Sequence, residues 1–136
     1  MKDNFSFHTT TLPGRVPVTV LHLQGQIDTN TYEKFQSGAE KEYQNGARAL
    51  LLDLSEVSYI SSAGLRAIHN IYKLFSANSS KESSEAIKKG LSDGTYKAQQ
   101  LKLLNPNDDV FKVLKMAGFD MYLEIFHTQK EAISAF

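Results

Sequence analysis

The chain has 136 residues, which is the length of one domain whose core can be stable without metals or disulfide bonds. Fifteen basic and fifteen acidic residues give a formal net charge of zero, which argues against direct binding of nucleic acid. The sequence contains no cysteine, so disulfide bonds, thiolate catalysis and cysteine-rich zinc sites are excluded. No apolar run is long enough for a signal peptide or a membrane span, and we therefore expect a soluble, cytoplasmic protein.

The first predicted elements are two strands joined by a turn. Phe5 and Phe7 alternate with polar residues, and after the Pro-Gly pair at 13–14 an extended apolar run covers residues 16–23. Together these features predict a β-hairpin. His22 lies within the second strand, where a lone histidine is usually a packing residue, and we assign it no chemistry.

A helix is predicted next. From Thr31 onward, apolar residues recur at helical spacing until the Asn-Gly pair at 45–46 ends the pattern. Any of Asp28, Thr29 and Asn30 could cap this helix by accepting a bond from a backbone N–H group at its start.

The third strand and the second helix follow. Residues 50–54 form a short apolar run, which predicts a strand buried on both faces. After Ser61 and Ser62 the apolar residues change to helical spacing, so a helix begins there. The alternation of strands and helices predicts parallel strands with right-handed crossovers, which places Asp28 and Ser62 at the same edge of the sheet.

The Ser61-Ser62 pair has two interpretations. Either hydroxyl oxygen can cap the second helix by accepting a bond from an unpaired backbone N–H group. The positive end of the helix would also tolerate a phosphate on a serine. Capping alone is the commoner role of such a pair, so the helix start by itself does not indicate modification.

The second half of the chain begins with a polar, serine-rich segment. Residues 76–100 predict a long insert, within which residues 84–89 could form a short helix. Residues 101–104 predict a strand, after which an acidic helix start leads to a helix that ends at Gly118.

The end of the chain predicts one more strand and one more helix. Residues 121–126 are expected to be the last strand. Thr128 and Glu131 then have the spacing of a capping box, which predicts a terminal helix that buries Ala132 and Ile133.

Two segments resemble the signature of the STAS domain, which sulfate transporters share with bacterial anti-sigma-factor antagonists. The chain reads Asp53-Leu54-Ser55 and then Ser61-Ser62-Ala63-Gly64-Leu65. The antagonists usually read Asp-Leu-Ser, followed by Asp-Ser-Ser-Gly-Leu or Asp-Ser-Thr-Gly-Leu. The resemblance implies a single STAS-like α/β domain over residues 1–136, with a mixed, mostly parallel sheet of about five strands and about four helices in the order ββαβαβαβα.

The resemblance also implies a site. Ser62 matches the hydroxyl residue that a partner kinase phosphorylates, and Gly64 matches the family glycine. Ser61 stands where the family has an aspartate, and Ala63 stands where it has a second hydroxyl residue. Residues 25–28 are similar to the family's Gly-x-Leu-Asp segment, which implies that Asp28 lies near the phosphorylation site.

The function implied by this resemblance is a regulatory binding module. An anti-sigma factor with serine kinase activity would be the partner, and it would bind the surface formed by Asp28, Ser61, Ser62, Ala63 and Gly64. The sigma factor would be freed while Ser62 is unphosphorylated, with Ser61 as the second candidate for modification and a phosphatase to reset the switch. The alternative is an unphosphorylated STAS subunit of a stress-signalling or transport complex, a reading favoured by the missing aspartate and the insert.

We do not expect an enzyme. The sequence contains no histidine pair with metal-ligand spacing, no glycine-rich phosphate loop after a strand and no Gly-x-Ser-x-Gly motif. A serine nucleophile would also need a base partner, and none is visible near Ser62. Cofactors and metals are therefore not expected.

Overall fold

The computed structural model describes residues 5–77 and 97–136, and in it five strands form one mixed sheet in the order β1-β2-β3-β4-β5. β1 is antiparallel to β2, and every other pair of neighbours is parallel, which confirms the predicted hairpin and the mostly parallel sheet. The strands are β1 (Phe5–Leu12), β2 (Val18–Ile27), β3 (Leu50–Ile60), β4 (Leu101–Leu104) and β5 (Ile125–Phe126).

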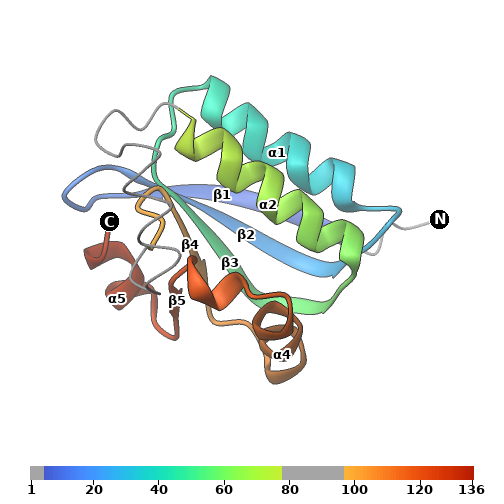
Figure 1. Ribbon diagram of the computed structural model, residues 1–136. Helices are drawn as coiled ribbons and strands as arrows, with labels where there is room; N and C mark the ends of the chain where they lie inside the picture. The colour runs from blue at the N-terminus through green and yellow to red at the C-terminus, as the bar shows by residue number, and fades with distance from the viewer. Residues whose placement is uncertain (1–4, 78–96) are drawn as a thin grey trace.

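Helices cover both faces of the sheet unequally. Figure 1 shows α1 and α2 lying side by side across one face, where α4 also packs, whereas α5 lies near the C-terminus on the other side of the sheet. These are the four predicted helices: α1 (Tyr32–Gln44), α2 (Ser62–Ser76), α4 (Asp108–Met116) and α5 (Gln129–Ser134).

Two cores result from this arrangement. The larger core lies between the sheet and the three helices, and its members include Leu21, Phe35, Leu52, Ile68 and Leu114. The smaller core lies between the sheet and α5 and consists of Val18, Val20, Ala49, Leu51, Leu104 and Ala132. Because successive side chains of β2 and β3 point to opposite faces, these strands contribute to both cores, which explains their nearly continuous apolar sequences.

Lys102 of β4 is a charged residue inside the fold, with only 2 % of its surface exposed. Its Nζ donates to the carbonyl oxygen of Ala98 at 3.1 Å and to Oε1 of Glu124 at 2.7 Å. The ring of Phe136 lies 5.3 Å from the ammonium nitrogen. These partners compensate the cost of removing the charge from water, and they join the segment before β4 to the segment before β5.

The prediction of a strand over residues 121–126 is wrong in its length. Only Ile125 and Phe126 pair with β4, and a 3₁₀ turn, η1 (Phe119–Met121), precedes them. Gly118 ends α4 with a φ of 82°, and the backbone N–H of Leu123 then bonds to the carbonyl of Phe119 at 2.9 Å. The chain therefore turns back to bury Phe119 before it can run along β4.

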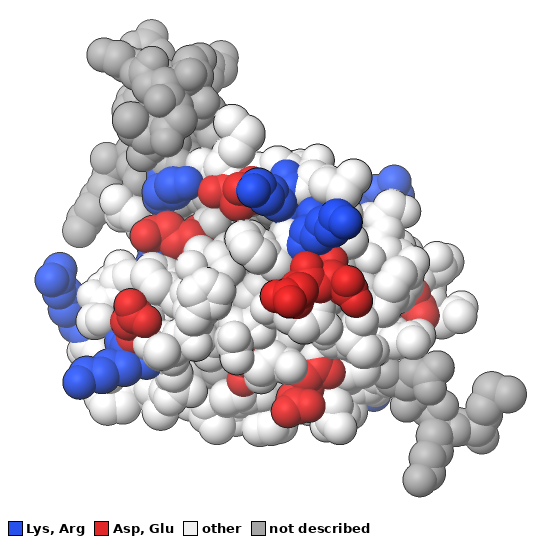
Figure 2. Space-filling view, turned by 90° about the horizontal axis from the view of Figure 1, so that it is seen from below, with Lys and Arg blue, Asp and Glu red and all other residues white. Residues whose placement is uncertain are grey.

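The predicted insert meets the described structure at both ends. α2 continues to Ser76, and Ala98, just before β4, is fully buried. The short helix predicted at residues 84–89 lies outside the described residues. On the face drawn in Figure 2, acidic and basic side chains lie among one another. No helix within the described ranges is long and apolar enough to cross a bilayer.

Candidate functional site

The candidate site lies where β2 and β3 end beside each other. Ile27 pairs with Ile60, and the backbone N–H of Ser61 donates to the carbonyl oxygen of Ile27 at 2.9 Å. Asp28 and Ser61 therefore leave the sheet from neighbouring parallel strands. This is the shared edge that the strand–helix alternation predicted.

The turn from β2 into α1 fixes Asp28, although not as a helix cap. The N-cap of α1 is Thr31, so the prediction that Asp28, Thr29 or Asn30 fills this position is wrong. The Thr31 hydroxyl accepts from the N–H of Asp28 at 2.9 Å and donates to the carbonyl of Gln26 at 2.7 Å, so it closes the turn instead of capping the helix. Oδ1 of Asp28 accepts from the N–H of Asn30 at 2.9 Å, which orients the carboxylate.

The two serines at the start of α2 have different environments. Ser61 is the N-cap, with an extended backbone, and its Oγ accepts from the N–H of Gly64 at 3.4 Å. Ser62 is the first residue of the helix and is exposed, and its hydroxyl makes no hydrogen bond with any residue that the structure describes. The fold therefore uses the hydroxyl of Ser61 and leaves that of Ser62 open to solvent.

Gly64 allows α2 to lie close to the sheet. A Cβ atom at this position would stand 2.7 Å from Cγ1 of Ile60 and 2.9 Å from the carbonyl oxygen of Ile27. The first distance is too short for two carbon atoms that are not bonded, and the second is too short for a carbon and an oxygen atom. Gly64 is buried, so it can contribute to the predicted partner-binding surface only indirectly, by positioning Ser61 and Ser62.

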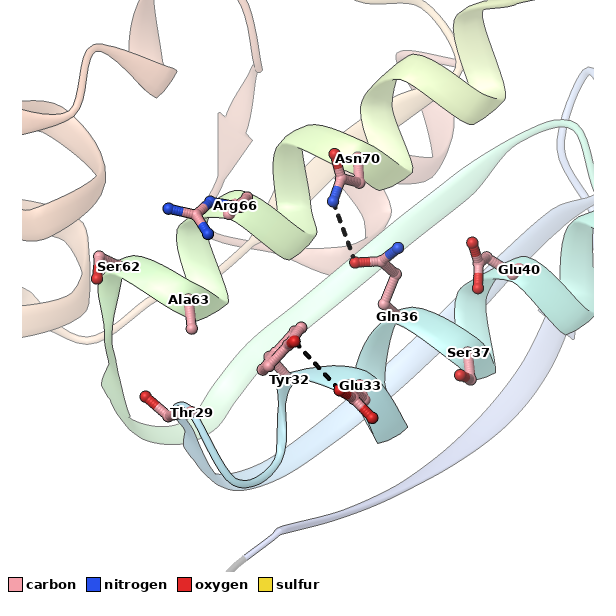
Figure 3. A pocket seen from close by; sticks show the side chains of 10 residues that line it. All are labelled: Thr29, Tyr32, Glu33, Gln36, Ser37, Glu40, Ser62, Ala63, Arg66 and Asn70. Atoms are coloured by element: carbon pink, nitrogen blue, oxygen red, sulfur yellow. Dashed lines mark hydrogen bonds between the residues drawn. The ribbon is translucent and has the colours of Figure 1, made fainter.

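A cleft of about 700 Å³ runs between α1 and α2 beside Ser62 (Figure 3). One hydrogen bond crosses between its walls, in which Asn70 Nδ2 of α2 donates to Gln36 of α1 at 3.3 Å, and within the α1 wall Tyr32 Oη donates to Glu33 at 3.1 Å. The main lining residues are Thr29 from the turn, Tyr32, Glu33, Gln36 and Glu40 from α1, and Ser62, Ala63, Arg66 and Asn70 from α2.

Two charged side chains of the cleft act on the phenol of Tyr32. The hydrogen bond to Glu33 and the charge of that carboxylate raise the pKa of Tyr32, while the positive charge of Arg66 opposes this shift. Tyr32 thus stays a protonated donor. Among the residues that the structure describes, the lining contains hydroxyl, amide and charged groups but no histidine. Nowhere in the described ranges do three or more His, Cys, Asp or Glu residues gather in a way that could hold a metal ion.

The predicted site residues gather at this edge with unequal access. Ser62 and Ala63 line the cleft, Asp28 lies on the adjoining turn, and Ser61 and Gly64 support the helix start. Their role in binding a partner stays a prediction. Sequence reasoning missed the rest of the lining, notably Arg66. One signal was available for it, because Arg66 follows Ser62 by four residues and so shares its helical face.

A second polar cluster lies away from this edge, on the sheet face that α5 partly covers. His22 Nδ1 contacts Oδ2 of Asp53 at 2.8 Å, and its Nε2 contacts Oγ1 of Thr10 at 2.9 Å. The His22 ring also stacks on that of His8, with 4.6 Å between the centroids. Burial by itself would raise the pKa of Asp53, but hydrogen bonds from Ser55 and His22 outweigh it and lower the pKa. Sequence analysis missed this cluster, which cross-strand pairing creates.

These features define a single α/β domain that presents an exposed serine at a helix start beside a polar cleft. The family follows from the sequence itself. Residues 9–81, more than half of the chain, match the STAS domain family, and the chain belongs to that family. The match spans β1 to α2 and includes the candidate site.

Solved structures have the same fold. TM1081 from Thermotoga maritima aligns at 24% identity with a TM-score of 0.66, over 93% of this chain and 90% of that chain. The Bacillus anti-sigma factor antagonist SpoIIAA, in its unphosphorylated form, aligns at 18% identity with a TM-score of 0.67, over 94% and 93%. An anti-sigma factor antagonist from Mycobacterium paratuberculosis aligns at 19% identity with a TM-score of 0.65, over 93% and 91%.

Proposed function

We propose that this chain is a binding module of the anti-sigma factor antagonist type, and that phosphorylation of Ser62 switches its binding off. One observation carries the proposal: the Ser62 hydroxyl is exposed, has no hydrogen bond to a described residue and stands at a helix start that Ser61 already caps. A kinase can modify such a hydroxyl without breaking a bond that the fold needs. SpoIIAA, which has the same fold, exists in an unphosphorylated and a phosphorylated form.

In the unmodified state, the surface around Asp28, Ser62 and Ala63 binds an anti-sigma factor that has serine kinase activity. Binding displaces the sigma factor. The kinase transfers the γ-phosphoryl group of ATP to Oγ of Ser62, which loses its proton, and ADP leaves. A phosphatase restores the hydroxyl by hydrolysis.

The phosphate acts at the interface and leaves the fold intact. It carries nearly two negative charges at neutral pH into a surface that already has the carboxylates of Asp28 and Glu33. Repulsion and the cost of removing water from the phosphate therefore weaken partner binding. The first turn of α2 accommodates the charge because unpaired N–H groups point out of a helix start.

The test compares Ser62→Ala with Ser62→Asp. We expect Ser62→Ala to bind the anti-sigma factor and to take up no phosphate, as measured by calorimetry and intact-mass spectrometry after incubation with ATP. Ser62→Asp should bind at least about ten-fold more weakly, which corresponds to about 1.4 kcal/mol, while its Tm stays close to that of the wild type.

The matched control is Ser6→Asp, which adds the same charge to an exposed serine of β1 on the other face of the sheet. It should bind like the wild type. Equal binding by Ser62→Ala and Ser62→Asp would contradict the switch. A kinase that modifies another antagonist but leaves this chain unmodified would favour the unphosphorylated accessory subunit instead.

A further inference from the structure

Arg66 is a charged residue of the cleft for which the binding surface proposed above gives no role. It is exposed on α2 and is the one basic residue among the described residues that line the cleft, whose α1 wall carries the carboxylates of Glu33 and Glu40. Within the described part of the chain its guanidinium makes no ion pair or hydrogen bond. Its charge acts on Tyr32 at longer range. The guanidinium is therefore free to take another partner.

The spacing of Arg66 and Ser62 identifies that partner. Residues four apart on an α-helix lie on one face, and long side chains lean toward the N-terminus of the helix. Figure 3 shows the Arg66 side chain extending toward the first turn of α2, where Ser62 stands. A group added to Oγ of Ser62 would grow into the space that the guanidinium can reach.

We propose that Arg66 binds the phosphate of phosphorylated Ser62 through its guanidinium and so forms an intrachain clamp, an inference that rests on the proposed phosphorylation of this serine. A planar guanidinium can donate two parallel N–H bonds to a phosphate, and its charge is permanent at neutral pH. The neighbouring position favours this clamp, because Ser61 is neutral where the antagonist signature has an aspartate that would compete for the cation.

The clamp gives the switch a second effect. Phosphorylation adds an anion at Ser62 and, at the same time, engages the guanidinium of Arg66. A partner that presents an acidic group to Arg66 therefore loses that contact when Ser62 is modified. The lining then keeps the carboxylates of Glu33 and Glu40, while the charge of Arg66 is compensated by the phosphate.

The experiment uses the full chain with phosphoserine incorporated genetically at position 62, so it needs no kinase. The phosphate is titrated by ³¹P NMR in the wild-type background and in Arg66→Gln. We expect the acid dissociation constant of the phosphate to be about three-fold higher when Arg66 is present. Arg66→Lys should keep part of this difference because it keeps the charge.

Two controls isolate the clamp. Phosphoserine placed at position 6 should titrate identically with and without Arg66, and unphosphorylated Arg66→Gln should have nearly the Tm of the wild type. Identical titration of phosphoserine 62 in both backgrounds would overturn the clamp. That result would leave phosphorylation by a kinase open, whereas a missing kinase reaction with an intact titration difference would contradict only the proposed function.

Discussion

Gly64 and Ser61 hold the first turn of α2 against the sheet, and Ser62 is exposed because they do so. The backbone of Gly64 lies within contact distance of Ile27 and Ile60, and the cap hydroxyl of Ser61 occupies the N–H of Gly64. A larger residue at position 64 would push this turn away from the sheet, and a residue without a hydroxyl at position 61 would leave the turn without its cap. The position of the Ser62 hydroxyl thus depends on its two neighbours.

We expect Gly64→Ala to destabilise the protein by about 1–3 kcal/mol, because the new methyl group overpacks the contact with Ile27 and Ile60. The gain in helix propensity, about 1 kcal/mol, works against this loss. Urea unfolding measures the difference. Ser62→Ala, two residues away on the exposed surface, is the control and should change stability by less than about 0.5 kcal/mol. A Gly64→Ala protein as stable as the wild type would show that α2 can shift freely.

Asp53 predicts a dependence of stability on pH. Its pKa in the folded protein is lowered below the ordinary value of 3.8, so the folded state favours the charged form. The resulting stabilisation is present above the ordinary pKa and is lost as pH falls through the folded pKa. Asp53→Asn should therefore be less stable than the wild type by about 1–2 kcal/mol near neutral pH, with a difference that shrinks below about pH 4.

The measurement is urea unfolding of both proteins between about pH 3 and pH 7, a range that spans the titration of ordinary carboxylates. Glu56→Gln, a change at an exposed carboxylate of the same strand, should show a difference near zero throughout. A difference between Asp53→Asn and the wild type that does not vary with pH would mean that the charge of Asp53 is not what stabilises the fold.

Among the elements, α4 depends on one residue for two connections. Oδ1 of Asn107 accepts from the N–H of Val110 at 2.7 Å and caps the helix, and Nδ2 of the same side chain donates to the carbonyl of Val57 at 3.1 Å. The cap thus also ties α4 to β3. An aspartate can form the first bond but cannot donate the second.

We expect Asn107→Ala to cost about 1–2 kcal/mol and Asn107→Asp to cost less, because the aspartate keeps the cap and loses only the tie to β3. Hydrogen exchange separates the two effects. In Asn107→Ala the N–H groups of the first turn of α4 should exchange faster, whereas in Asn107→Asp they should keep most of their protection. Equal loss of protection in both variants would mean that the tie, and not the cap, holds this turn.

Periodicity predicted most elements because their apolar patterns match their burial. The leucines of residues 50–54 and 101–104 are buried in the sheet, and the spacing of Thr128 and Glu131 correctly gave the start of α5. Residues 121–126 differ from the predicted strand because their apolar composition accompanies a turn. The start of α1 also differs from the prediction, because the Thr31 hydroxyl bonds backward to β2 instead of forward into the helix.

The sequence could indicate which candidate residues lie at one edge of the sheet, but it could not indicate the cleft between α1 and α2. The shared edge of Asp28 and Ser62 follows from parallel topology. The cleft depends on the distance between α1 and α2, and that distance results from packing over residues such as Phe35 and Ile68 that carry no signal of the cleft. The pairing of His22 with Asp53 depends likewise on the register of β2 against β3, and no local sequence pattern predicts that register.

Because acidic and basic residues balance over the whole molecule, one phosphate should clearly change its isoelectric point. The chain has formal net charge zero and a sequence pI near 6.9. One phosphate adds nearly two negative charges near neutral pH. Isoelectric focusing of the phosphorylated chain should therefore give a band clearly below that of the unmodified chain. Ser62→Ala incubated with the same kinase should remain at the unmodified position, and a second, more acidic band in that variant would reveal another phosphorylation site.

The buried amine of Lys102 can be used to measure how often the fold opens. Its amine is enclosed by Ala98, Glu124 and Phe136, so an acylating reagent that reacts with surface lysines should not reach it in the native state. Reagent uptake at this one position, followed by peptide mass spectrometry, then counts excursions in which β4 and its neighbours separate. The same assay, run on living cells, would report whether the folded population changes when a regulatory partner is present.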